Sequence, residues 1–94
     1  MMHELVEVLM DMRKEVRCAD KYAAEAKKHR EEFPELSMVY SRIAVEKLAH
    51  ADMLCKQAEQ MARKEHMEDV WNVEKMMFDM DAEHVKSMME HYHK

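Results

Sequence analysis

Hydrophobic residues recur at alternating four- and three-residue steps through the first third of the chain. This spacing places them on one face of an α-helix, and it predicts a helix over residues 2–32. Pro34 ends that helix, because its ring and its missing N–H do not fit a helix interior. The predicted buried face consists of Leu5, Leu9, Met12, Val16, Ala19, Ala23, Ala26, Arg30 and Phe33.

The same pattern resumes after Pro34 and predicts a second helix over residues 35–64, with Pro34 suited to its first turn. It breaks near residues 63–69, where we expect a turn, with Asp69 capping the next helix. Because the chain contains no Gly, one uninterrupted helix from residue 35 to 92 is the alternative. That helix would be about 87 Å long and would force a swapped or filament-like dimer. The eight predicted inward positions, three of them polar, are Leu36, Tyr40, Ile43, Lys47, His50, Leu54, Gln57 and Met61.

A third helix is predicted over residues 69–92 by a wide apolar face in which Glu74, Asp81 and His84 are embedded. The 94 residues include no Gly and one Pro, and 48% are hydrophobic and 37% charged, which is typical of a single all-α domain. We therefore expect an antiparallel three-helix bundle that dimerises to complete its core. The apolar face of the third helix consists of Val70, Trp71, Val73, Met77, Phe78, Met80, Val85, Met88 and Tyr92.

Charge and hydropathy argue against several classes of function. The formal net charge is −5 with acids and bases interleaved, so no basic strip can follow a phosphate backbone, and we expect no nucleic-acid partner. No apolar run approaches the roughly 20 residues of a membrane span, and the N-terminus lacks the order of a secretory signal. We therefore expect no membrane partner and a cytoplasmic location. Cys18 and Cys55 lack a C-x-x-C spacing and are expected to be reduced thiols.

Two pairs of metal-competent side chains fall at helical spacing inside the apolar stripes. They are Glu46 with His50 and Asp81 with His84. Residues three or four apart share one face of a helix, so each pair is expected to point into the bundle. Carboxylate oxygen and imidazole nitrogen suit Fe(II), Mn(II) or Zn(II), and the same spacing also suits a buried ion pair.

The segment Ile43–His50, I-A-V-E-K-L-A-H, resembles the I-A-x-E-E-x-x-H signature of rubrerythrin-type members of the ferritin-like superfamily. Glu15 and Tyr22 are similar to that family's ligand Glu followed one heptad later by an aromatic residue. The P-E-L sequence at residues 34–36 is similar to its hairpin segment. The resemblance covers residues 12–55, and it implies a ferritin-like helical hairpin with transition-metal binding.

The chain departs from the family at one position, because Lys47 stands where the metal-bridging Glu lies three residues before His50. An ammonium group repels a dication, so an ordinary di-iron centre and its oxidase activity are not expected. The segment Asp81–His84 reads D-x-x-H and is similar to a shortened form of the family's second E-x-x-H. The candidate metal ligands are Glu15, Glu46, His50, Asp81 and His84.

Two functions remain open at this point. The first is a small ferritin-like protein that binds a divalent transition metal. The second is a non-catalytic, homo-oligomeric interaction or scaffold protein without a metal, in which Lys47 pairs with Glu15 or Asp81 across the helices. Its expected interface is the third helix, which is rich in methionine and aromatic residues. Each unpaired buried polar group costs about 1 to 3 kcal/mol, so either arrangement has to satisfy the polar layer. For Asp81 and His84, a solvated face or a hydrogen bond at a dimer interface is a further alternative.

Overall fold

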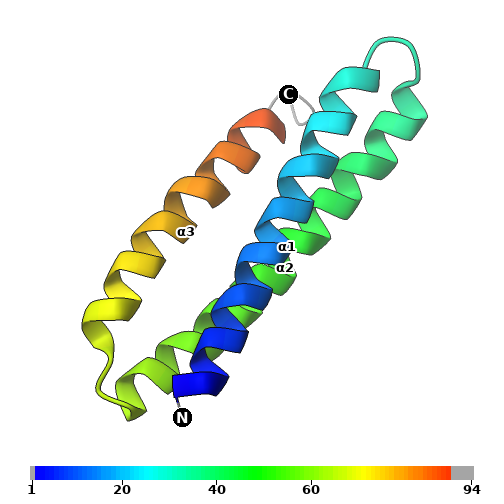
Figure 1. Cartoon of the computed structure of the whole chain (residues 1–94). Coiled ribbons are helices and arrows are strands. Elements are labelled where there is room, and N and C mark those ends of the chain that lie inside the picture. The colour runs from blue at the N-terminus through cyan, green and yellow to red at the C-terminus, as the bar shows by residue number, and fades with distance from the viewer. Residues whose placement is uncertain (1, 90–94) are drawn as a thin grey trace.

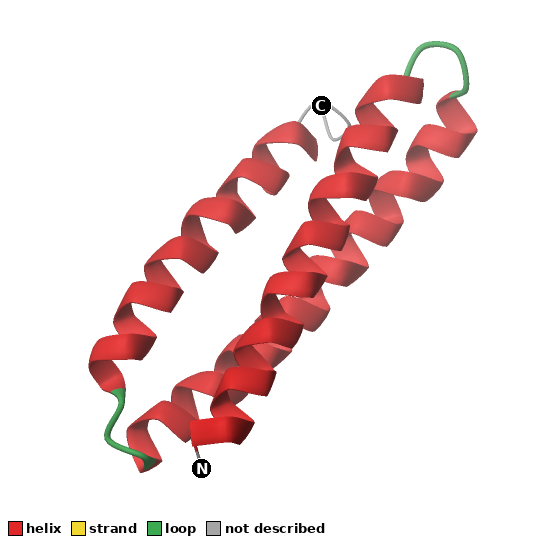
Figure 2. Cartoon of the chain, viewed as in Figure 1, coloured by secondary structure: helices red, strands yellow, loops and turns green. Residues whose placement is uncertain are grey.

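The structure, a computed structural model, describes residues 2–89 and contains three α-helices within them. They are α1 (Met2–His29), α2 (Pro34–Lys64) and α3 (Glu68–Met89). The chain runs up, down and up again, so α1 and α3 are parallel to each other and antiparallel to α2 (Figures 1 and 2). The bundle is elongated, with extents of 50 × 18 × 14 Å. This confirms the predicted all-α three-helix bundle, and the part of the third helix predicted beyond residue 89 lies outside the described residues.

The α1–α2 hairpin is closed by backbone and hydroxyl hydrogen bonds. Helix α1 ends three residues earlier than predicted, and the Phe33 amide donates to the His29 carbonyl at 2.9 Å. Pro34 opens α2 as predicted, with Phe33 at the N-cap providing no side-chain hydrogen bond. The buried Ser37 hydroxyl instead donates to the Ala26 carbonyl at 2.5 Å, which ties the start of α2 to the end of α1.

Small side chains form the contact between α1 and α2. The predicted face of α1 is correct as far as Ala26, whereas the predicted face of α2 is wrong by one residue. The buried stripe of α2 is rich in alanine, and alanine lets two helices approach closely. The close packing of this stripe stabilises the bundle more than burial of the larger side chains one position earlier would. His50 and Gln57 are consequently exposed. The buried residues of α2 are Ser37, Ser41, Ala44, Ala51, Cys55, Ala58 and Ala62.

A turn separates α2 from α3, so the expected turn is confirmed and the alternative of one continuous helix is wrong. The Met67 amide donates to the Ala62 carbonyl at 2.7 Å and the His66 amide to the Arg63 carbonyl at 3.3 Å. These two bonds form a Schellman motif, in which the residue after the C-cap takes a left-handed conformation. His66 has a φ of 57° in this position. Helix α3 then begins at Glu68, so Asp69 lies inside its first turn and the prediction that it caps the helix is wrong.

Helix α3 covers the hairpin with only one side of its wide apolar face. Trp71 packs near the N-terminal end of α1, and Val85 and Met89 pack against the alanine-rich middle of the hairpin. Phe78 and Met88 are partly buried against the core, and Tyr92 lies outside the described residues. The remaining members of the predicted apolar face are exposed, as described below. No described helix is long and apolar enough to cross a bilayer.

Candidate functional site

The predicted ligand Glu15 lies between α1 and α2, beside the residue that departs from the ferritin-like motif. Lys47 Nζ lies 3.4 Å from Glu15 Oε2, and His50 Nδ1 lies 3.7 Å from the same oxygen. Oε2 is buried and accepts no hydrogen bond from the described residues. An ammonium group therefore stands next to the carboxylate, which is the pairing expected for a polar layer without metal.

The other predicted ligands lie elsewhere. Glu46 is exposed on α2, while Asp81 and His84 lie on α3 and line a groove between α3 and α1. Throughout residues 2–89, no three His, Cys, Asp or Glu side chains lie close enough together to hold a metal ion. The structure thus brings Glu15 and His50 together, but it does not join them to Asp81 and His84. The residues present do not fit the metal centre that the resemblance implies.

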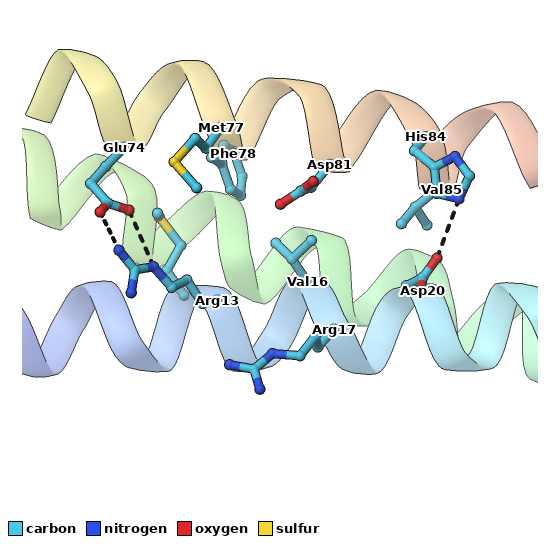
Figure 3. Close-up of a pocket in the computed structure, with 11 residues that line it drawn as sticks. Arg13, Val16, Arg17, Asp20, Glu74, Met77, Phe78, Asp81, His84 and Val85 are labelled. Carbon is cyan, nitrogen blue, oxygen red and sulfur yellow. Dashed lines mark hydrogen bonds and ion pairs between the residues drawn. The ribbon is translucent and has the colours of Figure 1, made fainter.

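The groove between the parallel helices α1 and α3 has a volume of about 280 Å³ (Figure 3). Its apolar lining comes from both helices, and its rims are charged. Both rims carry several ionisable groups, with the two arginines on α1 and most of the acids on α3. The lining residues are Met12, Arg13, Val16, Arg17, Asp20, Glu74, Met77, Phe78, Asp81, His84 and Val85.

Two polar contacts cross this groove. The Arg13 guanidinium donates two hydrogen bonds to the Glu74 carboxylate, one of them from Nε to Oε2 at 3.2 Å. Bidentate contacts of this kind fix geometry better than single ion pairs do. Further along, His84 Nε2 lies 3.7 Å from Asp20 Oδ1, with both side chains more than half exposed. Together the two contacts set the relative height of α1 and α3.

Two oppositely charged residues on the groove have no polar partner. Arg17 is on α1 and Asp81 is on α3, and both are exposed. Neither forms a hydrogen bond or ion pair with any other residue in the described range. Figure 3 shows the Arg17 side chain extended away from α3, while Asp81 points toward the space between the helices.

Apolar side chains beside the groove are exposed as well. On α1, Val6 and Met10 are 47% and 59% exposed. On α3, the exposed side chains recur at three- and four-residue steps, so they form a second stripe beside the buried one. The stripe consists of Val70, Val73, Met77 and Met80, which are 45%, 58%, 51% and 68% exposed. We call these four side chains, Val6, Met10 and the groove together the α1–α3 face.

The described cysteines do not favour nucleophilic chemistry. Burial raises the pKa of the Cys55 thiol above its usual value, which keeps it protonated and unreactive. Cys18 is partly buried on α1 and is also a free thiol. The expectation of reduced thiols agrees with this arrangement.

Comparison of the chain with protein-family models, curated proteins and solved structures gave no match. The ferritin-like resemblance therefore depends on the sequence motif alone. The function has to be inferred from the geometry of the described residues.

Sequence reasoning missed most of the α1–α3 face. It identified the apolar residues of α3 and, in the scaffold hypothesis, expected that helix to form the interface. It did not separate the exposed stripe from the buried one, and it did not single out Val6, Met10 or Arg17. Helical spacing does carry the signal, because residues 70, 73, 77 and 80 follow the same three- and four-residue steps as the buried stripe. Two apolar stripes on one helix indicate two partners.

Proposed function

We propose that this chain is a non-catalytic helical interaction module that associates with a second copy of itself through the α1–α3 face. The observation that carries the proposal is the set of exposed apolar side chains on α1 and α3 that accompanies the groove between these helices. Exposed apolar surface rimmed by charged residues is typical of a protein interface.

The surface area of the chain supports association. The chain exposes 6829 Å², whereas a compact monomer of 11.3 kDa exposes about 5,700 Å². The excess, roughly 1,100 Å², exceeds the roughly 800 Å² that one partner contributes to an interface of standard size. The three helices alone therefore leave enough surface for a stable dimer.

The character of the groove favours a second copy as the partner. Its α1 rim carries Arg13, Arg17 and Asp20 and is basic on balance. Its α3 rim carries Glu74, Asp81 and His84 and is acidic on balance. A face with a basic side and an acidic side is complementary to itself after a two-fold rotation. Self-association also agrees with the small size of the chain, whose core consists largely of alanine.

The polar layer between α1 and α2 supports a structural function for the remaining candidate ligands. Lys47 provides a positive charge beside Glu15, so the layer needs no metal ion to compensate that carboxylate. In this proposal Glu15, Lys47 and His50 orient α1 and α2 relative to each other. Metal binding is the competing function, and the experiment below separates the two.

The molar mass in solution tests the proposal. We expect light scattering or sedimentation to show a dimer that dissociates on dilution across about a hundredfold range of concentration and is unchanged by EDTA. Met77→Lys should weaken the dimer by at least about tenfold, because it places a charge in the apolar stripe. The matched control Met53→Lys makes the same change at an exposed methionine of α2 and should leave association unchanged.

Two results would contradict the proposal. A monomer at every concentration would remove the self-association. A dimer that dissociates in EDTA, and that forms again when Zn(II) or Fe(II) is added, would favour the metal-binding function instead.

A further inference from the structure

We propose that the two copies associate in parallel, around a two-fold axis that runs along the helices, so that Arg17 of each copy pairs with Asp81 of the other. This inference rests on the proposed self-association and specifies its geometry. In this arrangement α1 of one copy lies against α3 of the second copy, and the four helices surround the axis.

The heights of the residues along the bundle support the pairing. Within one copy, Arg13 contacts Glu74 and Asp20 contacts His84, so these contacts define two levels of the α1–α3 face. Arg17 lies between the two levels on α1, and Asp81 lies between them on α3. A rotation about an axis parallel to the helices does not change height. It therefore brings Arg17 level with Asp81 of the second copy.

The distribution of charge favours this axis over the alternative. A two-fold axis perpendicular to the helices would place α1 against α1 and α3 against α3. Arg17 would then face the basic rim of the second copy, and Asp81 would face the acidic rim. Like charges in an interface disfavour association, whereas the parallel arrangement places the basic rim opposite the acidic rim.

The apolar side chains give an independent argument for the parallel arrangement. Val6 and Met10 lie in the N-terminal part of α1, and Val70 and Val73 lie in the N-terminal part of α3. Because α1 and α3 are parallel, all four lie at the same end of the bundle (Figure 1). Parallel association places the apolar ends of the two copies against each other. Antiparallel association over the full length of the face would place each apolar end against the opposite end of the other copy, where none of these four side chains lies.

The second copy provides the polar partners that Arg17 and Asp81 do not have within residues 2–89 of their own copy. Neither forms an ion pair within the described part of the chain, although Arg13 and Glu74, one turn or two away, do so. Arg17 extends away from the α3 helix of its own copy, toward the solvent (Figure 3). Its long side chain can therefore reach a second copy, and the partner that the geometry assigns to it is Asp81.

Charge reversal tests the pairing and its direction together. Arg17→Glu and Asp81→Arg should each weaken the homodimer by at least about tenfold at low ionic strength, because each symmetric dimer contains two repulsive pairs. An equimolar mixture of the two variants should form a heterodimer as tight as the parent, since both of its pairs are attractive. The double variant should form a homodimer again, and it should not associate with the parent chain.

The controls make the same charge changes away from the α1–α3 face. Arg42→Glu on α2 and Asp11→Arg on α1 alter exposed residues that do not line the groove, and both should associate within about twofold of the parent. Circular dichroism should show the same helix content for all variants. Added salt should reduce the differences, because it screens exposed pairs.

The outcomes distinguish this inference from the proposed function. If Arg17→Glu binds the parent chain more tightly than the parent chain binds itself, Arg17 faces the basic rim, the copies are antiparallel and the inference is wrong. If the parent dimerises and neither reversal changes its affinity, the pairing is wrong while self-association stands. A parent that remains monomeric at all concentrations overturns both.

Discussion

At the scale of single residues, the end of α2 shows how the chain makes a turn without glycine. His66 takes a left-handed backbone conformation in the Schellman motif, a position where glycine is usual. A side chain with a Cβ atom costs about 1 kcal/mol there. The hydrogen bonds from His66 and Met67 to the end of α2 offset this cost.

We therefore expect His66→Gly to raise the free energy of unfolding by about 0.5 to 1 kcal/mol, because glycine adopts this conformation without steric cost. Urea denaturation of the isolated variant measures the change. Lys64→Gly, two residues earlier in the last turn of α2, is the control and should lower the free energy of unfolding by up to about 1 kcal/mol. A loss of stability in His66→Gly would show that the turn does not require the left-handed conformation.

Lys47 shows at the same scale what the sequence could predict about chemistry. Its departure from the ferritin-like motif indicated a positive charge in place of a ligand, and the structure places its ammonium 3.4 Å from Glu15 Oε2. The sequence could not predict that Asp81 and His84 would lie on a different side of α1. That result depends on which flank of the hairpin α3 covers, and side-chain packing determines the flank.

At the scale of helices, periodicity predicted the number, type and approximate bounds of the elements. It predicted the wrong face for α2, because the pattern weighed Leu36, Ile43 and Leu54 more heavily than alanine. Close approach of two helices requires small residues, and α1 offers Ala19 and Ala23 in the same contact. Hydrophobicity alone does not contain that information. The geometry of the partner helix determines which stripe is buried.

The close contact between α1 and α2 requires small side chains at its buried positions. Ala58→Leu should lower the free energy of unfolding by about 1 to 3 kcal/mol, because residue 58 is fully buried between the helices and a larger side chain forces them apart. Ala49→Leu adds the same atoms at an exposed position of α2 and should be nearly neutral. Thermal or urea denaturation compares the two. Equal effects at both positions would contradict the observed register of α2.

At the scale of the whole molecule, the apolar side chains of α3 fall into two groups. One group is buried in the fold, and the other is exposed and available for association. Trp71 and Val85 face the hairpin and belong to the core, whereas Val73, Met77 and Met80 contribute to no contact within the bundle core. The sequence predicted that the chain would need a partner, because long helices with broad apolar faces in a short chain generally need a partner to cover them. It could not predict which face would stay open, since that depends on how far α3 rotates about its own axis as it packs.

If a second copy covers the α1–α3 face, folding and association are linked, and the melting temperature depends on concentration. We expect the melting temperature of the parent to rise as the protein is concentrated, since association stabilises the folded state by mass action. At concentrations where the parent dimerises and Met77→Lys does not, the variant should melt at a nearly constant temperature, because an exposed methionine contributes little to the stability of the monomer. At high dilution the two proteins should melt alike. Parallel concentration dependence in both would show that the copies meet through another surface.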